Sequence, residues 1–277
     1  MTQTRRASGL TDAQFSRLCR LIQDHFGIEV PERKRPMLEV HLAKLAREMG
    51  YLDFASFFAE HLSQKPSEKV VSALVDGAST NHTYFWREPA HFRVLQERVI
   101  PELMVQGERE HDLRIWCAAA ATGEEAVTLA MLAREAVLGT QWHTGVLATD
   151  ISSTALGKAR GGSWRADNVE RLPQRLQQHF LPEQGGARQL SGTIQDLVTW
   201  RRLNLLAGPY PFRKPFQVVF CRNVLIYFDE EHTRAVLNSI HEVMVPGGYL
   251  FLSHSETIGR NSPPFEYVQP GVYRRRK

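Results

Sequence analysis

The hydrophobic pattern of this 277-residue chain changes near residue 113, and the new pattern limits the possible folds. A short apolar strand at 113–118 precedes a helix at 124–137, and a second strand at 145–149 ends at Asp150. Short strands that alternate with helices are typical of a parallel sheet covered by helices on both faces. The pattern therefore predicts an α/β domain with a Rossmann-like sheet.

The same alternation returns later in the chain, where three further elements are expected at 217–221, 230–243 and 249–253. A closing hairpin follows at about 267–273. The stretch before these elements is polar and irregular. We interpret it as a small β-subdomain inserted into the sheet domain at about 181–203, with a small hairpin around Ser191.

The first part of the chain shows helical spacing instead. Apolar residues recur at intervals of three and four at Phe15, Leu18, Ile22 and Phe26. Gly27 then marks the end of this helix, and similar patterns continue to about residue 80. The predicted organisation has three parts, namely an all-α N-terminal domain at 1–80, a linker segment and helix at 81–112, and the sheet domain at 113–277.

The composition is that of a globular protein, with 43% hydrophobic and 23% charged residues. No apolar run reaches the roughly 18 residues of a membrane span, and the start MTQTRRASG lacks the apolar core of a signal peptide. We therefore expect a cytoplasmic protein without direct membrane insertion. The three cysteines form no CxxC pair and the eleven histidines no pair at metal-ligand helical spacing, so we predict no metal site.

The segment WCAAAATGEEA at 116–126, between the first strand and its helix, indicates the ligand. A dinucleotide site there needs the GxGxxG pattern, because pyrophosphate approaches the backbone closely and the helix N-terminus attracts anions. This segment has one glycine, Gly123, followed by two acids that repel phosphate, Glu124 and Glu125. Acids at a helix start can also serve only as partners of the helix dipole. The functional interpretation is a phosphate-free, cationic ligand such as S-adenosylmethionine.

Asp150 ends the second strand, where a Rossmann-like fold places the acid that binds the ribose hydroxyls. An aspartate at this place can instead cap the following helix. Together with the alanine-rich turn it favours an adenosine ligand. The sequence contains no GxSxG, HExxH or GxxxxGK[ST] motif, so serine esterase, zincin and P-loop functions lose their main support.

Several motifs occur along nearly the whole chain: TNHTYFWRE at 80–88, ATGEE at 121–125, ATDI at 148–151, LNL at 203–205, FCRNVLIYF at 220–228 and SHSE at 253–256. In this order they resemble the motifs of the CheR family of chemoreceptor glutamate methyltransferases. The resemblance implies that S-adenosylmethionine donates a methyl group to glutamate carboxylates on cytoplasmic helices of methyl-accepting chemoreceptors. The product of the cofactor would be S-adenosylhomocysteine.

The resemblance also implies roles for individual residues. Arg87 and Tyr227 would lie nearest the transferred methyl group, as the catalytic residues. Arg87 could instead pair with an acid such as Glu88, and Tyr227 could be a core aromatic. The cofactor-binding residues that the family implies are Asn81, Thr83, Arg87, Glu124, Asp150, Asn204, Leu205, Arg222 and Asn223. Among these, Glu124 would take the ammonium group of the cofactor and Asp150 its ribose.

The chain departs from the family pattern at several positions. Alanines occupy 119–121, where Gly, Cys or Ser is common, and His82 and Trp86 stand where Glu and Phe are usual. These changes concern the geometry of the cofactor site. The expected insertion is shorter than in members that tether to a C-terminal pentapeptide of the receptor, so we expect no such tether. We also expect a monomer, with a regulatory protein as a further partner.

Two other functions compete with receptor methylation. One is a cofactor-binding regulatory module that has lost transferase activity. The other is a nucleic-acid methyltransferase, which the basic pI of 9.0 would favour. Amino-methylases of bases need a polar-Pro-Pro-aromatic turn to grip a flipped base, whereas the corresponding place here reads RNVL at 222–225. We therefore predict no nucleic-acid partner.

Overall fold

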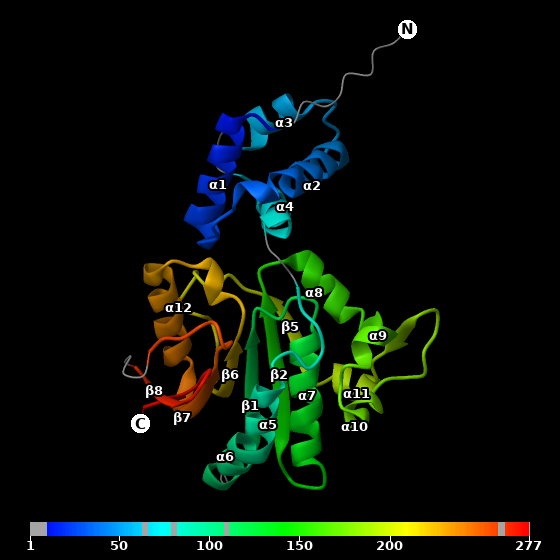
Figure 1. Ribbon diagram of the computed structural model, residues 1–277, viewed down its shortest axis with the longest axis vertical. Coiled ribbons are helices and arrows are strands. Elements are labelled where there is room, and N and C mark those ends of the chain that lie inside the picture. The colour runs from blue at the N-terminus through cyan, green and yellow to red at the C-terminus, as the bar shows by residue number, and fades with distance from the viewer. Residues whose placement is uncertain (1–9, 63–65, 79–81, 108–110, 260–263, 277) are drawn as a thin grey trace. The chain divides into compact units, whose positions relative to one another are not determined.

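The computed structural model of the chain describes residues 10–62, 66–78, 82–107, 111–259 and 264–276. The chain forms two compact units. One comprises residues 1–80 together with 151–153, and the other comprises 81–150 together with 154–277. Figure 1 labels the helices and strands of both units.

The smaller unit consists of helices, namely α1 (Asp12–Phe26), the 3₁₀ turn η1 (Glu32–Lys34), α2 (Arg35–Glu48), α3 (Phe54–His61) and α4 (Glu68–Ala78). Helix α1 begins with a capping box, in which Thr11 and Gln14 each accept a hydrogen bond from the other's backbone N–H. It ends at Gly27, whose φ of 64° lies in the left-handed region. The apolar residues at helical spacing on α1 are buried. The predicted all-α character of this part of the chain is confirmed.

The larger unit contains a seven-stranded sheet with the order β5-β2-β1-β6-β7-β9-β8. Its strands are β1 (Asp112–Ala118), β2 (His143–Asp150), β5 (Val198–Arg202), β6 (Phe216–Cys221), β7 (Met244–Phe251), β8 (Phe265–Gln269) and β9 (Val272–Arg275). The first five strands in this order are parallel, and β9 is antiparallel to both neighbours. From β1 the chain first adds β2 and β5 on one side of the sheet, and then β6 and β7 on the other side. The strand order thus reverses between β1 and β6, and a ligand is expected beyond the carboxyl ends of these two strands. The predicted Rossmann-like sheet is confirmed.

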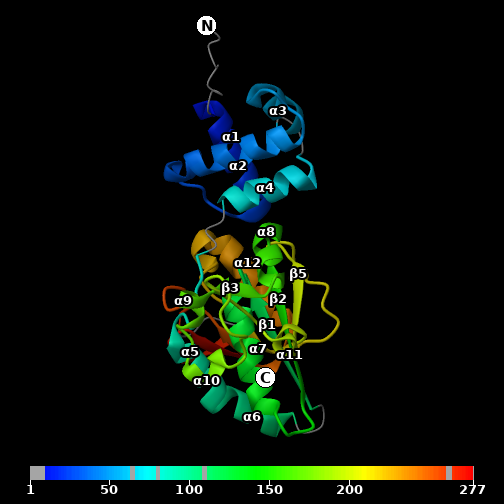
Figure 2. The same ribbon diagram turned by 90° about the vertical axis from the view of Figure 1, so that its right-hand side faces the viewer.

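Helices precede and connect the strands of the larger unit. They are α5 (Pro89–Val94), the π-helical η2 (Leu95–Val99), α6 (Ile100–Gln106), α7 (Glu124–Val137), α8 (Ser153–Arg160), α9 (Ala166–Val169), α10 (Gln174–Gln177), α11 (Gly192–Gln195), the 3₁₀ turn η3 (Leu225–Tyr227) and α12 (Glu230–Glu242). Successive side chains of a strand point to opposite faces of a sheet. In β1, Cys117 lies in the core that includes Val127 of α7, whereas Trp116 lies in the core that includes Ile240 of α12. The helices α7 and α12 therefore cover opposite faces of the sheet, as the two views in Figures 1 and 2 show.

The inserted segment differs from the sequence prediction. Residues 198–202, which were expected within the insertion at 181–203, form β5, the edge strand that pairs with β2. The small antiparallel sheet is formed by β3 (Ser163–Arg165) and β4 (Ala187–Gln189), and the expected hairpin around Ser191 is instead the start of α11. An edge strand buries only part of its surface. Its polar residues therefore made it indistinguishable from an irregular insertion.

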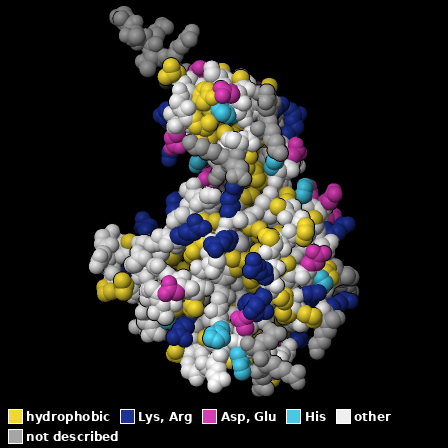
Figure 3. Space-filling model, turned by 180° about the vertical axis from the view of Figure 1, so that it is seen from behind, with side chains coloured by type: hydrophobic (Ala, Val, Ile, Leu, Met, Phe, Trp, Pro, Cys, Tyr) yellow, Lys and Arg dark blue, Asp and Glu magenta, His cyan; other side chains and the backbone are white. Residues whose placement is uncertain are grey.

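The surface of the larger unit carries mixed charges. Figure 3 shows Lys and Arg side chains prominent on one face, with acidic and apolar side chains among them. The whole chain has a net charge of only +4. Among the described residues, no helix combines the length and the apolar character that crossing a membrane requires.

Candidate active site

The turn between β1 and α7 has an unusual backbone. Ala119, Ala121 and Gly123 have φ values of 73°, 47° and 97°, in a region that non-glycine residues rarely adopt. A Cβ atom at Gly123 would lie 2.8 Å from the Ala159 side chain and 2.8 Å from the Trp200 ring, so only glycine fits there. The backbone N–H groups of Ala119 and its successor both donate to the Thr149 carbonyl at 2.8 Å. This turn is therefore held against the end of β2.

Glu124 is the first residue of α7 and is only 4% exposed. Its carboxylate accepts hydrogen bonds from the Thr122 hydroxyl at 2.7 Å and from the Asn168 amide at 3.1 Å. Both partners are neutral, and burial raises the pKa of the Glu124 carboxyl. Within the described part of the chain, no basic side chain forms an ion pair with Glu124. A cationic group of a ligand would therefore meet a carboxylate that the protein has not neutralised.

Asp150 ends β2 and is 7% exposed. Its Oδ2 atom accepts a hydrogen bond of 2.8 Å from the Ala121 N–H, and its carbonyl accepts one of 3.0 Å from the Leu203 N–H. These bonds connect Asp150 to the turn after β1 and to the residue after β5. The strands β1, β2 and β5 are parallel, so all three carboxyl ends lie at one edge of the sheet. Asp150 thus lies at the edge where the fold predicts the ligand.

A second group of charged residues lies beside this turn, and we call Glu88, Glu125 and Arg222 the Arg222 cluster. The Arg222 side chain is 1% exposed, and its Nη1 atom lies 2.6 Å from Glu125 Oε2. Its Nη2 atom lies 3.2 Å from Glu88 Oε2 and donates to the Arg87 carbonyl at 2.7 Å. Burial raises the pKa of Glu125 although Arg222 opposes the rise, whereas Arg222 lowers the pKa of Glu88 against the effect of burial. One buried guanidinium therefore joins α7 to the segment that carries Arg87.

The segment 82–88 precedes α5 and carries two predicted site residues, Thr83 and Arg87. Both are partly buried. Trp86 and Glu88, on either side of Arg87, have positive φ values of 63° and 57°. The Trp86 ring stacks on Phe92 at 5.0 Å, which anchors the segment to the core.

The guanidinium of Arg87 is oriented within its own segment. Its Nη1 atom donates to the His82 carbonyl at 2.9 Å, and its Cζ atom lies 5.8 Å from the centre of the Tyr84 ring. The ion-pair partner of Glu88 is Arg222 rather than Arg87, so the sequence alternative of an Arg87–Glu88 pair is not what the structure contains. The cation of Arg87 is thus held beside an aromatic ring at a partly exposed position.

The remaining predicted site residues follow the ends of β5 and β6. Asn204 is partly exposed and its Oδ1 accepts from the Leu206 N–H at 3.0 Å, whereas Leu205 is a buried core residue. Asn223, with a φ of 59°, donates its backbone N–H to Glu256 Oε2 at 2.7 Å. Tyr227 is the last residue of η3 and is partly buried. Asn81 lies outside the described residues.

Two residues of the site were not identified from the sequence. Asn168, in α9, donates to Glu124 and accepts from the Phe85 N–H at 3.2 Å. It therefore connects the start of α7, after the turn that follows β1, with the segment 82–88. Glu256 accepts from the N–H groups of Asn223 and Ser253. The sequence offered no signal for Asn168. Glu256 was part of the SHSE motif, but 253–256 lie in a loop after β7 rather than at the end of the predicted strand 249–253.

Comparison with known proteins identifies the family. A family model described as the CheR methyltransferase SAM-binding domain matches residues 81–273, and one described as the CheR methyltransferase all-alpha domain matches residues 13–76. The chain belongs to the CheR methyltransferase family. It is an S-adenosylmethionine-dependent methyltransferase, which confirms the enzyme class and the cofactor predicted from the sequence.

Curated relatives within the CheR family are similar over nearly their whole length. A chemotaxis protein methyltransferase from Borreliella burgdorferi is 33% identical, covering 96% of this chain and 95% of the relative. One from Escherichia coli is 35% identical, covering 95% and 91%, respectively. One from Salmonella typhimurium is 33% identical, covering 95% and 90%.

Solved structures outside this group are more distant. The N-methyltransferase NodS from Bradyrhizobium japonicum, solved in complex with S-adenosyl-L-homocysteine, is 16% identical with a TM-score of 0.31, covering 56% of this chain and 59% of that one. A match at this level bears on neither the function nor the site of the CheR-family chain.

The site residues of the CheR-family chain suit this cofactor. S-adenosylmethionine carries an ammonium group and a sulfonium but no phosphate, and Glu124 offers a carboxylate whose protein partners are neutral. Glu124, whose carboxylate forms no ion pair within the described residues, would repel a pyrophosphate at the place where a dinucleotide fold binds one. Charge at the turn therefore favours this cofactor over a nicotinamide dinucleotide.

Proposed function

We propose that this CheR-family enzyme methylates glutamate side chains on the cytoplasmic helices of chemoreceptors and acts in chemotaxis signalling. The names of its relatives, all chemotaxis protein methyltransferases, support this role. The observation that carries the proposal is an unneutralised carboxylate, Glu124, connected through Asn168 to the segment in which the His82 carbonyl holds the Arg87 guanidinium. The first suits the cationic methyl donor, and the second suits an anionic acceptor.

The cofactor-binding roles rest on residues that follow the carboxyl ends of the strands. Glu124 would accept hydrogen bonds from the ammonium group, and Asp150, held by the Ala121 N–H, would accept them from the ribose hydroxyls. Asn204, Leu205 and Asn223 follow β5 and β6 and would contact the adenine side. Arg222, whose side chain is 1% exposed, would contribute there through its backbone. Thr83, and Asn81 outside the described residues, would close over the cofactor from the segment before α5.

The chemistry requires little of the protein beyond positioning and desolvation. The cofactor, when bound, supplies an electrophilic methyl group. A glutamate is already ionised at neutral pH, so the protein needs no strong base to activate it. Arg87 would orient the acceptor carboxylate by paired hydrogen bonds, and Tyr227 would line the same place. Tight pairing with Arg87 would weaken the nucleophile, so its role is to position the carboxylate.

Methyl transfer from labelled S-adenosylmethionine to a chemoreceptor cytoplasmic fragment tests the proposal. The expected product is a base-labile methyl ester on the fragment. Arg87→Ala should reduce the rate by about 10²-fold or more, because misplacement of reacting groups by about 1 Å has an effect of this size. Cofactor affinity in the same variant, measured by calorimetry, should fall less than the rate.

Arg234→Ala is the matched control, because Arg234 is an exposed arginine of α12 that pairs only with a neighbouring acid, Glu230. It should retain the wild-type rate. Tight cofactor binding without any base-labile ester would contradict the proposal and support the regulatory-module alternative. Full activity of Arg87→Ala would remove Arg87 from the catalytic site.

A further inference from the structure

A buried histidine lies outside the proposed methyl-transfer site. His91, in α5, has no exposed surface, and its ring lies against the Pro270 backbone. Its Nδ1 atom has no hydrogen bond of normal geometry within the described part of the chain. Buried polar groups in folded proteins normally have a partner, so a nitrogen in this position indicates a group that a bound ligand would satisfy. The Nε2 side of the ring faces the backbone at Gly271, where a Cβ atom would lie 2.5 Å from Nε2. The other nitrogen, Nδ1, faces Glu88.

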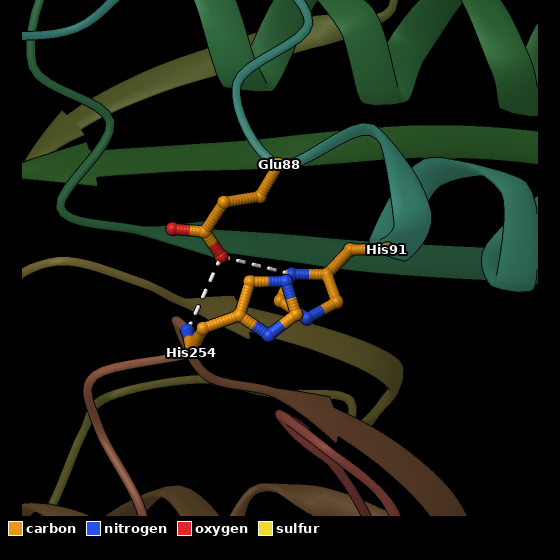
Figure 4. A group of neighbouring side chains, drawn as sticks. All are labelled: Glu88, His91 and His254. Carbon is orange, nitrogen blue, oxygen red and sulfur yellow. Dashed lines mark hydrogen bonds and ion pairs between the residues drawn. The ribbon is translucent and has the colours of Figure 1, made fainter.

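Two further ligand groups lie next to Nδ1 of His91. Glu88 Oε2 lies 3.4 Å from it, and the ring of His254 lies 4.7 Å from the His91 ring, measured between centroids. One ligand atom from each of the three side chains lies within 4.8 Å of the other two. Figure 4 shows the His254 ring beside the His91 ring, and the Glu88 carboxylate in contact with the His91 ring and with the His254 backbone N–H. Two imidazoles and one carboxylate are a known ligand set for zinc.

The distances fit an ion of this kind. Tetrahedral ligands at about 2.0–2.1 Å from zinc lie about 3.4 Å from one another, which matches the separation of Glu88 Oε2 and His91 Nδ1, 3.4 Å. His254 is exposed and lies in the loop after β7, so its ring can approach by side-chain rotation. Its exposure also leaves an entry path and an open fourth position for water.

The present partners of the Glu88 carboxylate leave room for a metal bond. Its Oε2 atom lies 3.2 Å from Arg222 Nη2 and accepts a bond of 3.3 Å from the His254 N–H. Charge-assisted hydrogen bonds are normally about 2.7–2.9 Å long, so neither contact is tight. Arg222 makes its short ion pair with Glu125 instead, at 2.6 Å.

The local charge also favours a cation. Three ionisable acids, Glu88, Glu125 and Glu256, are connected through Arg222 and Asn223. Among the described residues, Arg222 is the cation that pairs with these acids, so the three acids when ionised leave an excess of negative charge.

We infer that Glu88, His91 and His254 form a binding site for a divalent transition-metal ion of the zinc type. Imidazole ligands select such ions over Mg²⁺ and Ca²⁺, which prefer oxygen ligands only. The site does not depend on the proposed methyl transfer, since binding is measured without either substrate. It adjoins that site in the sequence, because Glu88 directly follows Arg87.

The test uses the full chain without a polyhistidine tag, stripped of metal with a chelator and dialysed. Zinc is titrated by calorimetry, and cobalt by its visible absorption. The expected result is one zinc ion per chain, visible bands typical of low-coordinate cobalt, and no competition by Mg²⁺. His254→Ala and Glu88→Gln should each weaken zinc binding at least about tenfold. Loss of a residue that only hydrogen-bonds to a metal ligand already weakens binding by about this factor.

His232→Ala is the matched control. His232 also lies beside an acid, Asp229 at 2.8 Å, but among the described residues this pair has no third side chain that could complete a metal site. It should bind zinc as the wild type does. His254 is exposed, so its variant should keep the wild-type melting temperature, which separates loss of a ligand from loss of the fold. Absence of zinc binding by the wild type, or equal affinity of His254→Ala, would overturn the inference.

Discussion

Glu124 and Glu125 are adjacent in the sequence, yet they belong to two regions with opposite electrostatic character. The region of Glu124 includes the turn after β1, and the groups of the described residues that bond its carboxylate, Thr122 and Asn168 among them, are neutral. Glu125 belongs to the Arg222 cluster, where a buried guanidinium lies 2.6 Å away. Two neighbouring acids can therefore differ in their charge partner, even though they occupy adjacent positions of one helix. Glu125 has its cation in the fold, whereas under the proposed function Glu124 would obtain one from the cofactor.

The largest expected effect breaks the Arg222 cluster. Arg222→Met should lower the free energy of unfolding by about 3–5 kcal/mol, because it leaves buried carboxylates without their charge partner. Unfolding in urea, followed by circular dichroism, measures the change. Arg234→Ala, which removes an exposed arginine, should change it by less than about 1 kcal/mol. If Arg222→Met lowered the free energy of unfolding by less than about 1 kcal/mol, the Arg222 cluster would stabilise the fold no more than a surface ion pair does.

The next effect separates the two glutamates directly. Glu124→Gln should weaken binding of S-adenosylmethionine by about 10- to 100-fold, since a hydrogen bond to a charged group contributes about 1.5–3 kcal/mol. Glu125→Gln is the same chemical change made in the Arg222 cluster. It should lower the cofactor affinity less than Glu124→Gln does, and lower the free energy of unfolding more. Calorimetry on both variants gives the comparison. Equal losses of affinity would remove the distinction between the two regions.

A smaller effect concerns the pH dependence of stability. Burial raises the pKa of Glu124 in the folded chain above its ordinary value of 4.5, so the folded state binds this proton more tightly than the unfolded state. Raising the pH above 4.5 therefore costs the cofactor-free wild type stability that Glu124→Gln does not lose. The difference in free energy of unfolding between the two should be constant below this pH, grow as the pH rises through the raised pKa of the folded state, and level off above that pKa. Urea unfolding at a series of pH values measures it, and a difference independent of pH would contradict the assignment.

The smallest effect concerns the backbone of the turn. Ala119 has a φ of 73°, which costs an alanine about 1–2 kcal/mol, whereas glycine adopts it readily but loses more chain entropy on folding. Ala119→Gly should therefore raise the free energy of unfolding by no more than about 1 kcal/mol. Urea unfolding provides the measurement. A clear loss of stability would show that the Ala119 side chain contributes packing that outweighs its backbone strain.

The sequence predicted those features that local patterns determine. Helix α7 was expected at 124–137 and is found at Glu124–Val137, because its acidic start and apolar spacing are properties of neighbouring residues. The partners of Arg222 could not be predicted, since Glu125 and Glu88 are 97 and 134 positions away and no local pattern connects them. The same limit applies to Asn168. The edge strand β5 was missed because its exposed arginines look like those of a loop.

The bond between Arg222 and the Arg87 carbonyl has a consequence for protein engineering. Chimeras between relatives commonly exchange one loop while the remaining scaffold stays constant. Here the loop before α5 is connected to α7 by this guanidinium and also through Asn168, so a transplanted loop needs matching residues at 125, 168 and 222. Donor and acceptor specificity in this enzyme would therefore be inherited together rather than exchanged one at a time.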